Sequence, residues 1–154
     1  AQKQARLEME MAAAVEQIAN AYTDKMRGVP VHRIHGDCHK GNLLEGKDGS
    51  FFLDFDDFLT GPGAQDIWLL VGGRDEEGAN QREIFVEAYN QFREFDPRWL
   101  SLVEPLRGLR YIHYAAWVAK RWHDPAFPSA FPEFDSEQRW VKETIDLEEQ
   151  AQRC

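Results

Sequence analysis

The chain has 154 residues, 43% of them apolar, so it is long enough to bury a core and is expected to form a single domain over residues 1–154. Its net charge is −9 and no run of Lys or Arg exceeds two residues, which argues against nucleic acid as a partner. No apolar stretch approaches a membrane span. Two distant cysteines argue against a disulfide framework. The composition therefore predicts a cytoplasmic protein that binds neither nucleic acid nor a membrane.

The first part of the chain has the pattern of one amphipathic helix. Apolar residues from Leu7 to Met26 recur at intervals of three or four, which places them on one face of a helix that ends near Arg27. Gly28 and Pro30 are typical of the end of such a helix. The next residues, VHRI, predict a short strand that leads into the polar sequence HGDCHKGN, residues 35–42.

A β-hairpin is predicted directly after this polar loop. Two apolar segments, NLLE and SFFLDF, flank the turn sequence GKDG. A two-residue turn at Asp48 and Gly49 would set Asn42 opposite Phe55, whereas a longer loop would set Asn42 opposite Leu53. In either register Asn42 and Asp54 are neighbours across two strands, within about 5–8 Å. We therefore expect the polar loop and the sequence LDFD to meet.

The remainder of the chain is expected to be helical. A proline-rich and aromatic loop over residues 123–134 interrupts the apolar periodicity. The predicted helical segments, in chain order, are 64–71, 84–95, 97–103, 105–122 and about 136–150. The predicted fold class is therefore α+β and mostly helical, with one small hairpin in the N-terminal third.

The polar loop and the hairpin together carry the residue types needed for phosphoryl transfer. The Asn42 amide oxygen and the Asp54 carboxylate are hard-oxygen ligands of the kind that Mg²⁺ takes, with its other positions left to water and phosphate. Asp37 is a second carboxylate, which can orient a hydroxyl and accept its proton. In this chemistry a protein contributes mainly positioning and charge neutralisation, so a base, two metal ligands and a nucleotide are sufficient.

These motifs resemble those of a known family. HGD, with Asn five residues after the Asp, followed by LDFD, is similar to the catalytic and metal loops of the aminoglycoside phosphotransferase and choline kinase family, relatives of the protein kinases. The resemblance implies that Asp37 is the catalytic base, that Asn42 and Asp54 bind Mg²⁺, and that His39 contacts a phosphate of ATP, the phosphoryl donor.

The resemblance also implies roles for two supporting residues, and it indicates which lobe of a kinase the chain forms. His35 would brace the loop from beneath, and Asp66 would hold the backbone amides of the loop. The chain contains neither a G-x-G-x-x-G loop nor a strand lysine with a helical glutamate partner, which belong to the N-terminal, nucleotide-binding lobe of such kinases. We therefore expect a protein kinase-like C-terminal lobe without its N-terminal lobe, and negligible kinase activity from this chain by itself.

Three functions are compatible with these motifs. Later blocks, GPGAQDIWLL, EPLRGLR and KRWHDPAFPSAFP, resemble a bacterial branch of the family that phosphorylates protein Ser/Thr in stress responses. A kinase for a small-molecule hydroxyl, on homoserine, choline or an aminoglycoside, is the alternative. A pseudokinase or binding module without turnover is the third possibility, and the intact set of Asp37, Asn42 and Asp54 argues against it.

Two other metal sites fit the sequence less well. A zinc site from His32, His35, His39 and Cys38 would leave the glycines of the loop unexplained. An EF-hand beginning at Asp54 lacks its later ligands and its glycine. The next acidic residues remain open: Asp56 could assist a second metal or hydrogen-bond the loop, and Asp57 fits a cap or turn.

Overall fold

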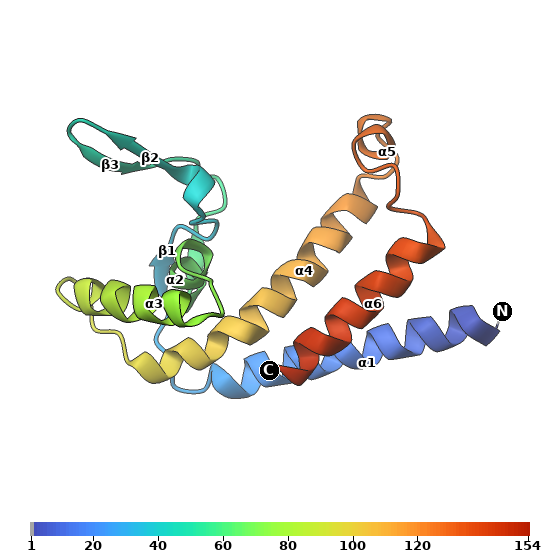
Figure 1. Cartoon of the computed structure of the whole chain (residues 1–154), viewed down its shortest axis with the longest axis horizontal. Coiled ribbons are helices and arrows are strands. Elements are labelled where there is room, and N and C mark those ends of the chain that lie inside the picture. The colour runs from blue at the N-terminus through green and yellow to red at the C-terminus, as the bar shows by residue number, and fades with distance from the viewer. Residues whose placement is uncertain (1) are drawn as a thin grey trace. The chain divides into compact units, whose positions relative to one another are not determined.

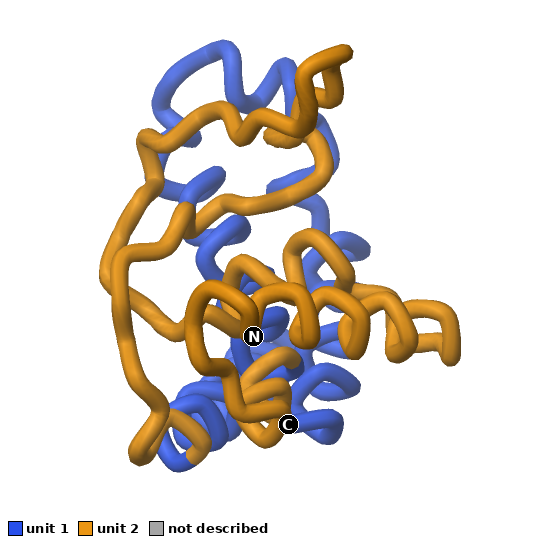
Figure 2. The backbone as a smooth tube through the Cα atoms, turned by 90° about the vertical axis from the view of Figure 1, so that its left-hand side faces the viewer, with its two compact units in different colours: residues 1–24, 104–154 blue, residues 25–103 orange. Residues whose placement is uncertain are grey.

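The computed structural model describes residues 2–154, which cluster into two compact units (Figure 2). Unit 1 combines the chain up to Asp24 with Glu104–Cys154, and unit 2 is Lys25–Val103. No helix within residues 2–154 has both the length and the apolar character needed to cross a membrane.

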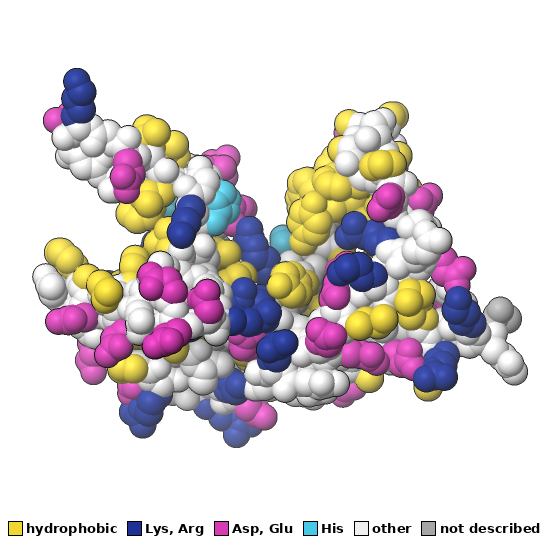
Figure 3. All heavy atoms as spheres, in the orientation of Figure 1, with side chains coloured by type: hydrophobic (Ala, Val, Ile, Leu, Met, Phe, Trp, Pro, Cys, Tyr) yellow, Lys and Arg dark blue, Asp and Glu magenta, His cyan; other side chains and the backbone are white. Residues whose placement is uncertain are grey.

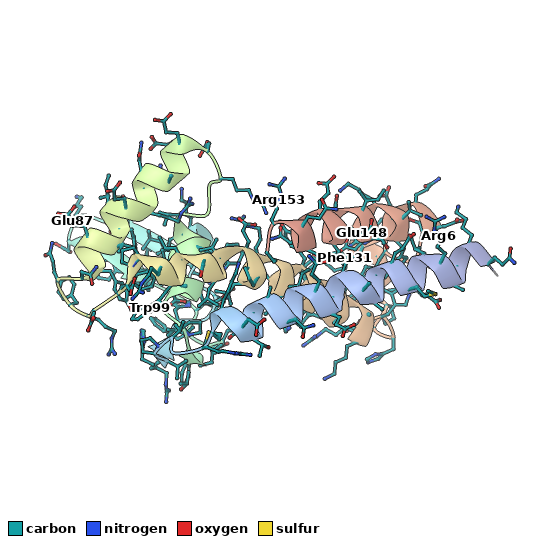
Figure 4. All side chains as sticks on the ribbon, turned by 90° about the horizontal axis from the view of Figure 1, so that it is seen from below. Arg6, Glu87, Trp99, Phe131, Glu148 and Arg153 are labelled. Carbon is teal, nitrogen blue, oxygen red and sulfur yellow. The ribbon has the colours of Figure 1, made fainter. Side chains whose placement is uncertain are left out.

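In the described part of unit 1, turns and short loops connect helices, and no strand occurs there (Figure 1). Its helices are α1 (Gln2–Lys25), α4 (Val103–Lys120), α5 (Ala126–Ala130) and α6 (Glu137–Gln152). Figure 4 shows α1 and α6 side by side, and their contact buries Ala14 and Ile18 of α1 against Leu147 and Ala151 of α6. The amide of Gln17 also donates to the Ala151 carbonyl, at 2.8 Å.

An aromatic cluster lies on α4 and α5 in the same unit. Tyr114 and Trp117 stack with an interplanar angle of 17°, and Phe127 and Phe131 pack against them. Figure 3 shows hydrophobic side chains gathered over this part of α4 and α5. The Arg121 guanidinium lies 4.6 Å from the centre of the Trp117 ring, so a cation–π contact already covers part of the cluster.

Unit 2 contains the strands and the polar loop. Antiparallel strands β1 (His32–Ile34) and β4 (Leu59–Gly61) form one two-stranded sheet, and β2 (Leu43–Gly46) and β3 (Gly49–Phe52) form another. The remaining elements are the 3₁₀ segments η1 (Lys40–Asn42) and η2 (Pro97–Leu102) and the helices α2 (Ala64–Leu70) and α3 (Glu76–Tyr89). The mostly helical α+β class predicted from the sequence, with its small hairpin, is confirmed.

The hairpin adopts the second of the two predicted registers, but with a two-residue turn at Lys47 and Asp48 rather than the predicted longer loop, because Gly46 pairs with Gly49. Leu43 pairs with Phe52 and Glu45 with Ser50, so Asn42 lies opposite Leu53. The Leu53 amide donates to the Asn42 carbonyl at 2.8 Å, which extends the pairing by one residue beyond the strands. Asp54 therefore follows directly after the residue that is paired with Asn42.

Three local predictions were wrong. The predicted helix over 84–95 ends at Tyr89, because the Asn90 side chain accepts from the Phe95 amide at 2.7 Å and donates to the Phe95 carbonyl, which closes a turn. The proline-rich loop contains the short helix α5, whereas the predicted helical segment 97–103 is confirmed, as the 3₁₀ helix η2 followed by the first residue of α4. Strand β4 was not predicted, because its sequence, LTG, overlaps the turn sequence GPG and carries no apolar pattern of a strand.

Candidate functional site

The loop that contains Asp37 is fastened to the start of α2 by one carboxylate. Asp66 Oδ2 accepts a hydrogen bond from the His35 amide at 2.8 Å, and Asp66 Oδ1 accepts one from the Gly36 amide at 2.9 Å. Hydrogen bonds to a charged acceptor are stronger than those between neutral groups. The contact predicted for Asp66 is thus confirmed, and it sets the path of the backbone that enters Asp37.

His35 connects the same loop to the residue before Asp54. Its ring is 7% exposed, its Nε2 lies 2.8 Å from the Leu53 carbonyl oxygen, and the ring packs on Phe55 at 4.7 Å between centroids. A carbonyl only accepts, so Nε2 carries the proton and donates, while the buried Nδ1 has no hydrogen-bond partner among the described atoms. The predicted brace is confirmed, and it acts on Leu53.

Asn42 contacts both halves of the candidate site. Its side-chain Nδ2 donates to the Asp37 carbonyl at 3.0 Å, and its own carbonyl accepts from the Leu53 amide at 2.8 Å. The His39 amide also donates to the Asp37 carbonyl, at 2.9 Å. Because Nδ2 is engaged with Asp37, the Oδ1 end of the Asn42 amide is the end that is left to act as an acceptor or ligand.

Asp54 lies beyond the end of β3 in an unusual backbone conformation. Its φ is 59°, and among the described residues it is the one residue other than glycine with positive φ. Asp tolerates this left-handed region better than most residues, but the conformation still stores strain, which functional sites often contain. The hydrogen bonds that His35 and Asn42 make to Leu53 hold the preceding residue and so favour this conformation.

His39 turns toward Asp37. Its Nδ1 accepts a hydrogen bond from the Gly41 amide at 3.0 Å, so in the neutral ring the proton is on Nε2. Nε2 lies 3.4 Å from Asp37 Oδ2, and the side chain is 40% exposed. His39 therefore sits beside the predicted base, and its predicted contact with a phosphate remains a prediction.

The other imidazoles named for a zinc site make different contacts. His32 Nε2 is 2.9 Å from the Tyr89 hydroxyl, and burial, followed by the charge of Arg93, lowers the pKa of His32. His35 Nε2 is engaged with Leu53, as described above. In residues 2–154 the structure holds no cluster of three or more His, Cys, Asp or Glu side chains arranged to bind a metal.

Cys38 is expected to be unreactive in the folded chain. It is 4% exposed, and burial, followed by the charges of Asp66 and Asp37, raises the pKa of its thiol to about 12. Because only the thiolate reacts, folded Cys38 should resist iodoacetamide from pH 7 to 10, while Cys154, which is partly exposed, is labelled. Mass spectrometry should find Cys38 labelled only after urea is added, with a rate that rises with pH near the ordinary thiol pKa. Rapid labelling of Cys38 in the folded chain at pH 8 would contradict this burial.

One residue that holds the loop was missed in the sequence. Gln65 Nε2 donates to the Gly36 carbonyl at 3.1 Å, and Gln65 Oε1 accepts from Trp68 Nε1 at 3.1 Å. Its neighbour Asp66 was identified by resemblance, but a single glutamine in the segment AQDIWLL carries no pattern that distinguishes it from a surface residue.

Asn42 thus joins the polar loop to the hairpin, and the carboxylate of Asp66 on α2 holds the backbone of the same loop. The model of the phosphotransferase enzyme family (APH) matches residues 1–103. The chain belongs to this family, and the family predicted from HGD, Asn42 and LDFD is confirmed.

Among curated proteins, the chain is similar to stress response kinase A. It is 47% identical to the Escherichia coli K12 protein over 121 residues, which is 79% of this chain and 37% of that protein. It is 46% identical to the Shigella flexneri protein of the same name, again over 79% of this chain and 37% of that protein. The Salmonella typhimurium protein named serine/threonine protein kinase RdoA is 45% identical over 77% of this chain and 36% of its own length. The chain thus spans little more than a third of these relatives.

Proposed function

We propose that this chain supplies the catalytic and metal-binding loops of an ATP-dependent kinase that phosphorylates Ser/Thr hydroxyls of proteins in a bacterial stress response. The observation that carries the proposal is the double contact of Asn42, to the Asp37 carbonyl and to the Leu53 amide. Through its side chain and its backbone carbonyl, Asn42 therefore links the loop of the proposed base to the loop of the proposed metal ligand. The name of the Salmonella typhimurium relative, serine/threonine protein kinase RdoA, supports a protein hydroxyl as the acceptor, and the name stress response kinase A supports the stress response.

The donor atoms of the site fit Mg²⁺. The Asn42 amide nitrogen is engaged with Asp37, which leaves Oδ1 for an ion, and the Asp54 side chain is exposed. Mg²⁺ is usually held by few protein oxygens and keeps waters and phosphate oxygens as its other ligands, so two protein ligands are sufficient. Bound there, Mg²⁺ would neutralise charge on the phosphates of ATP.

Asp37 would act as the general base. Its carboxylate would accept the proton of the acceptor hydroxyl while its backbone is held by Asn42 and His39. Because His39 Nε2 lies 3.4 Å from Asp37 Oδ2, His39 would help to orient this carboxylate, and its Nε2–H would also be available to donate to a phosphate.

The two units of residues 1–154 would form one catalytic and substrate lobe. The E. coli relative is roughly twice as long as this chain, because the same 121 matched residues make up 79% of this chain and 37% of that protein. That additional part of the relatives would complete the nucleotide-binding site, in the way that an N-terminal lobe covers ATP in such kinases. Without that additional part, this chain would show negligible ATP turnover.

The proposal is tested by measuring ATP turnover in a chimera, in which E. coli stress response kinase A carries this chain in place of its own matching segment. We expect Mg²⁺-dependent turnover and autophosphorylation. Asp54→Asn should raise the Mg²⁺ concentration at half-maximal rate by at least about tenfold, since even residues behind a metal ligand change affinity by that much. Asp48→Asn, the same change in the turn of the same hairpin, should have no effect.

Different outcomes separate the alternatives. Turnover with small-molecule alcohols but not with protein hydroxyls would favour the small-molecule kinase. A chimera that folds and binds ATP without turnover would favour the pseudokinase. An unchanged Mg²⁺ requirement in Asp54→Asn would contradict the proposed metal site.

A further inference from the structure

Gln65 makes two hydrogen bonds whose directions determine each other. Trp68 Nε1 lies 3.1 Å from Gln65 Oε1, and Gln65 Nε2 lies 3.1 Å from the Gly36 carbonyl oxygen. An indole N–H can only donate, so it requires the oxygen of the amide and turns the NH₂ group toward Gly36. Trp68 is 7% exposed, so its ring is a fixed reference for the glutamine amide.

The Gly36 carbonyl belongs to the peptide group that directly precedes Asp37. Asp66 holds the amide of Gly36, one peptide group earlier, and the amide of His35, two peptide groups earlier. Gly36 has a φ of +87°, and a glycine backbone can rotate more freely than any other, so Asp66 alone does not determine the orientation of the next peptide group. Gln65 holds that group.

The backbone of Asp37 is therefore held from both sides. Gln65 donates to the carbonyl before it, while the His39 amide and the Asn42 side chain donate to its own carbonyl, at 2.9 and 3.0 Å. The direction in which a side chain leaves the backbone follows from the peptide groups on both sides of its Cα. A carboxylate that must meet a hydroxyl proton depends on this direction, because misplacement by about 1 Å can cost about 10²-fold in rate.

We propose that Gln65 is a positioning residue for the proposed phosphoryl transfer. It fixes the peptide group between Gly36 and Asp37 and thereby aims the Asp37 carboxylate at the acceptor hydroxyl, with Trp68 fixing the Gln65 amide. This inference rests on the proposed function, because it requires Asp37 to be the base. Gln65 does not touch the reacting atoms, so its effect is on turnover rather than on nucleotide binding.

The test uses the kinase chimera and two substitutions of Gln65. Gln65→Glu retains an acceptor for Trp68 but turns a carboxylate oxygen toward the Gly36 carbonyl oxygen, and Gln65→Ala removes both contacts. Both should lower kcat by about tenfold, with KM for ATP changed less than twofold. Gln81→Ala, which removes a partly exposed glutamine of α3 bonded to Glu77, should leave kcat and KM unchanged.

A second control separates positioning from general destabilisation. Val86→Ala removes core volume in α3 and should lower Tm without lowering kcat at temperatures where the chimera is folded. Trp68→Phe should lower kcat in the parent chimera but not in the Gln65→Ala background, because its effect is transmitted through Gln65.

The experiment separates a failure of the inference on Gln65 from a failure of the proposed function. If Asp37→Asn abolishes turnover but both Gln65 variants match the parent, this inference alone is wrong. It is also wrong if Gln65→Ala lowers kcat only as much as Val86→Ala does at equal loss of Tm. If Asp37→Asn leaves turnover intact, Asp37 is not the base, and the proposed function and this inference fall together.

Discussion

Replacing Asp37 by asparagine is expected to lower kcat of the kinase chimera by about 10²- to 10⁴-fold, the range that a positioned general base contributes. Asparagine has the same shape but cannot accept the substrate proton. The Asp37 carbonyl, which accepts from His39 and Asn42, is unchanged by the substitution, so the loop should keep its conformation. Turnover is measured at saturating ATP and Mg²⁺, and the fold is checked by circular dichroism.

Two comparisons make the Asp37 experiment specific. Asp48→Asn removes the same charge from the hairpin turn and should retain full turnover. The free energy of unfolding of Asp37→Asn should lie within about 1 kcal/mol of the parent, since the hydrogen bonds to the backbone remain. Residual turnover above about a tenth of the parent would show that Asp37 does not accept the proton in the rate-limiting step.

The parts of the site that local sequence specifies were predictable. The hairpin follows from two apolar segments around GKDG, and the neighbourhood of Asn42 and Asp54 follows from it in either register. The roles of His35 and Asp66 came from the resemblance, since 31 residues separate Asp66 from the amide of His35 that it holds. Propensity and periodicity describe neighbours in sequence and contain no information on such a contact.

The features that were missed arise from tertiary contacts. Gln65 acts on Gly36 only because α2 packs behind the loop, and Trp68 selects the orientation of its amide. The early end of α3 depends on one side chain, Asn90, that closes a turn onto Phe95. The positive φ of Asp54 is likewise imposed by its surroundings, because the residue type alone only permits it.

The second large effect is expected at Gly36, where the loops that carry Asp37 and Asp54 cross. A Cβ on Gly36 would lie 2.3 Å from the Asp57 carbonyl oxygen, and the φ of Gly36 is +87°. In Gly36→Ala, the left-handed conformation should therefore lower the free energy of unfolding by about 1–2 kcal/mol, and the displaced backbone should lower it by about 1–3 kcal/mol. We expect the free energy of unfolding, measured with urea, to fall by about 3 kcal/mol.

Gly28→Ala separates the two contributions, because Gly28 has a similar φ of +77° but nothing within 4 Å of an added Cβ. It should cost only the conformational part, about 1–2 kcal/mol, and leave turnover of the chimera intact. Gly36→Ala has to move either the loop of Asp37 or the segment after Asp54, so it should lower kcat as well as stability. Equal losses of stability in the two variants would mean that the backbone around Asp57 moves away from the added Cβ at little cost in free energy. In that case the crossing of the two loops would not be what holds Asp37 and Asp54 in register.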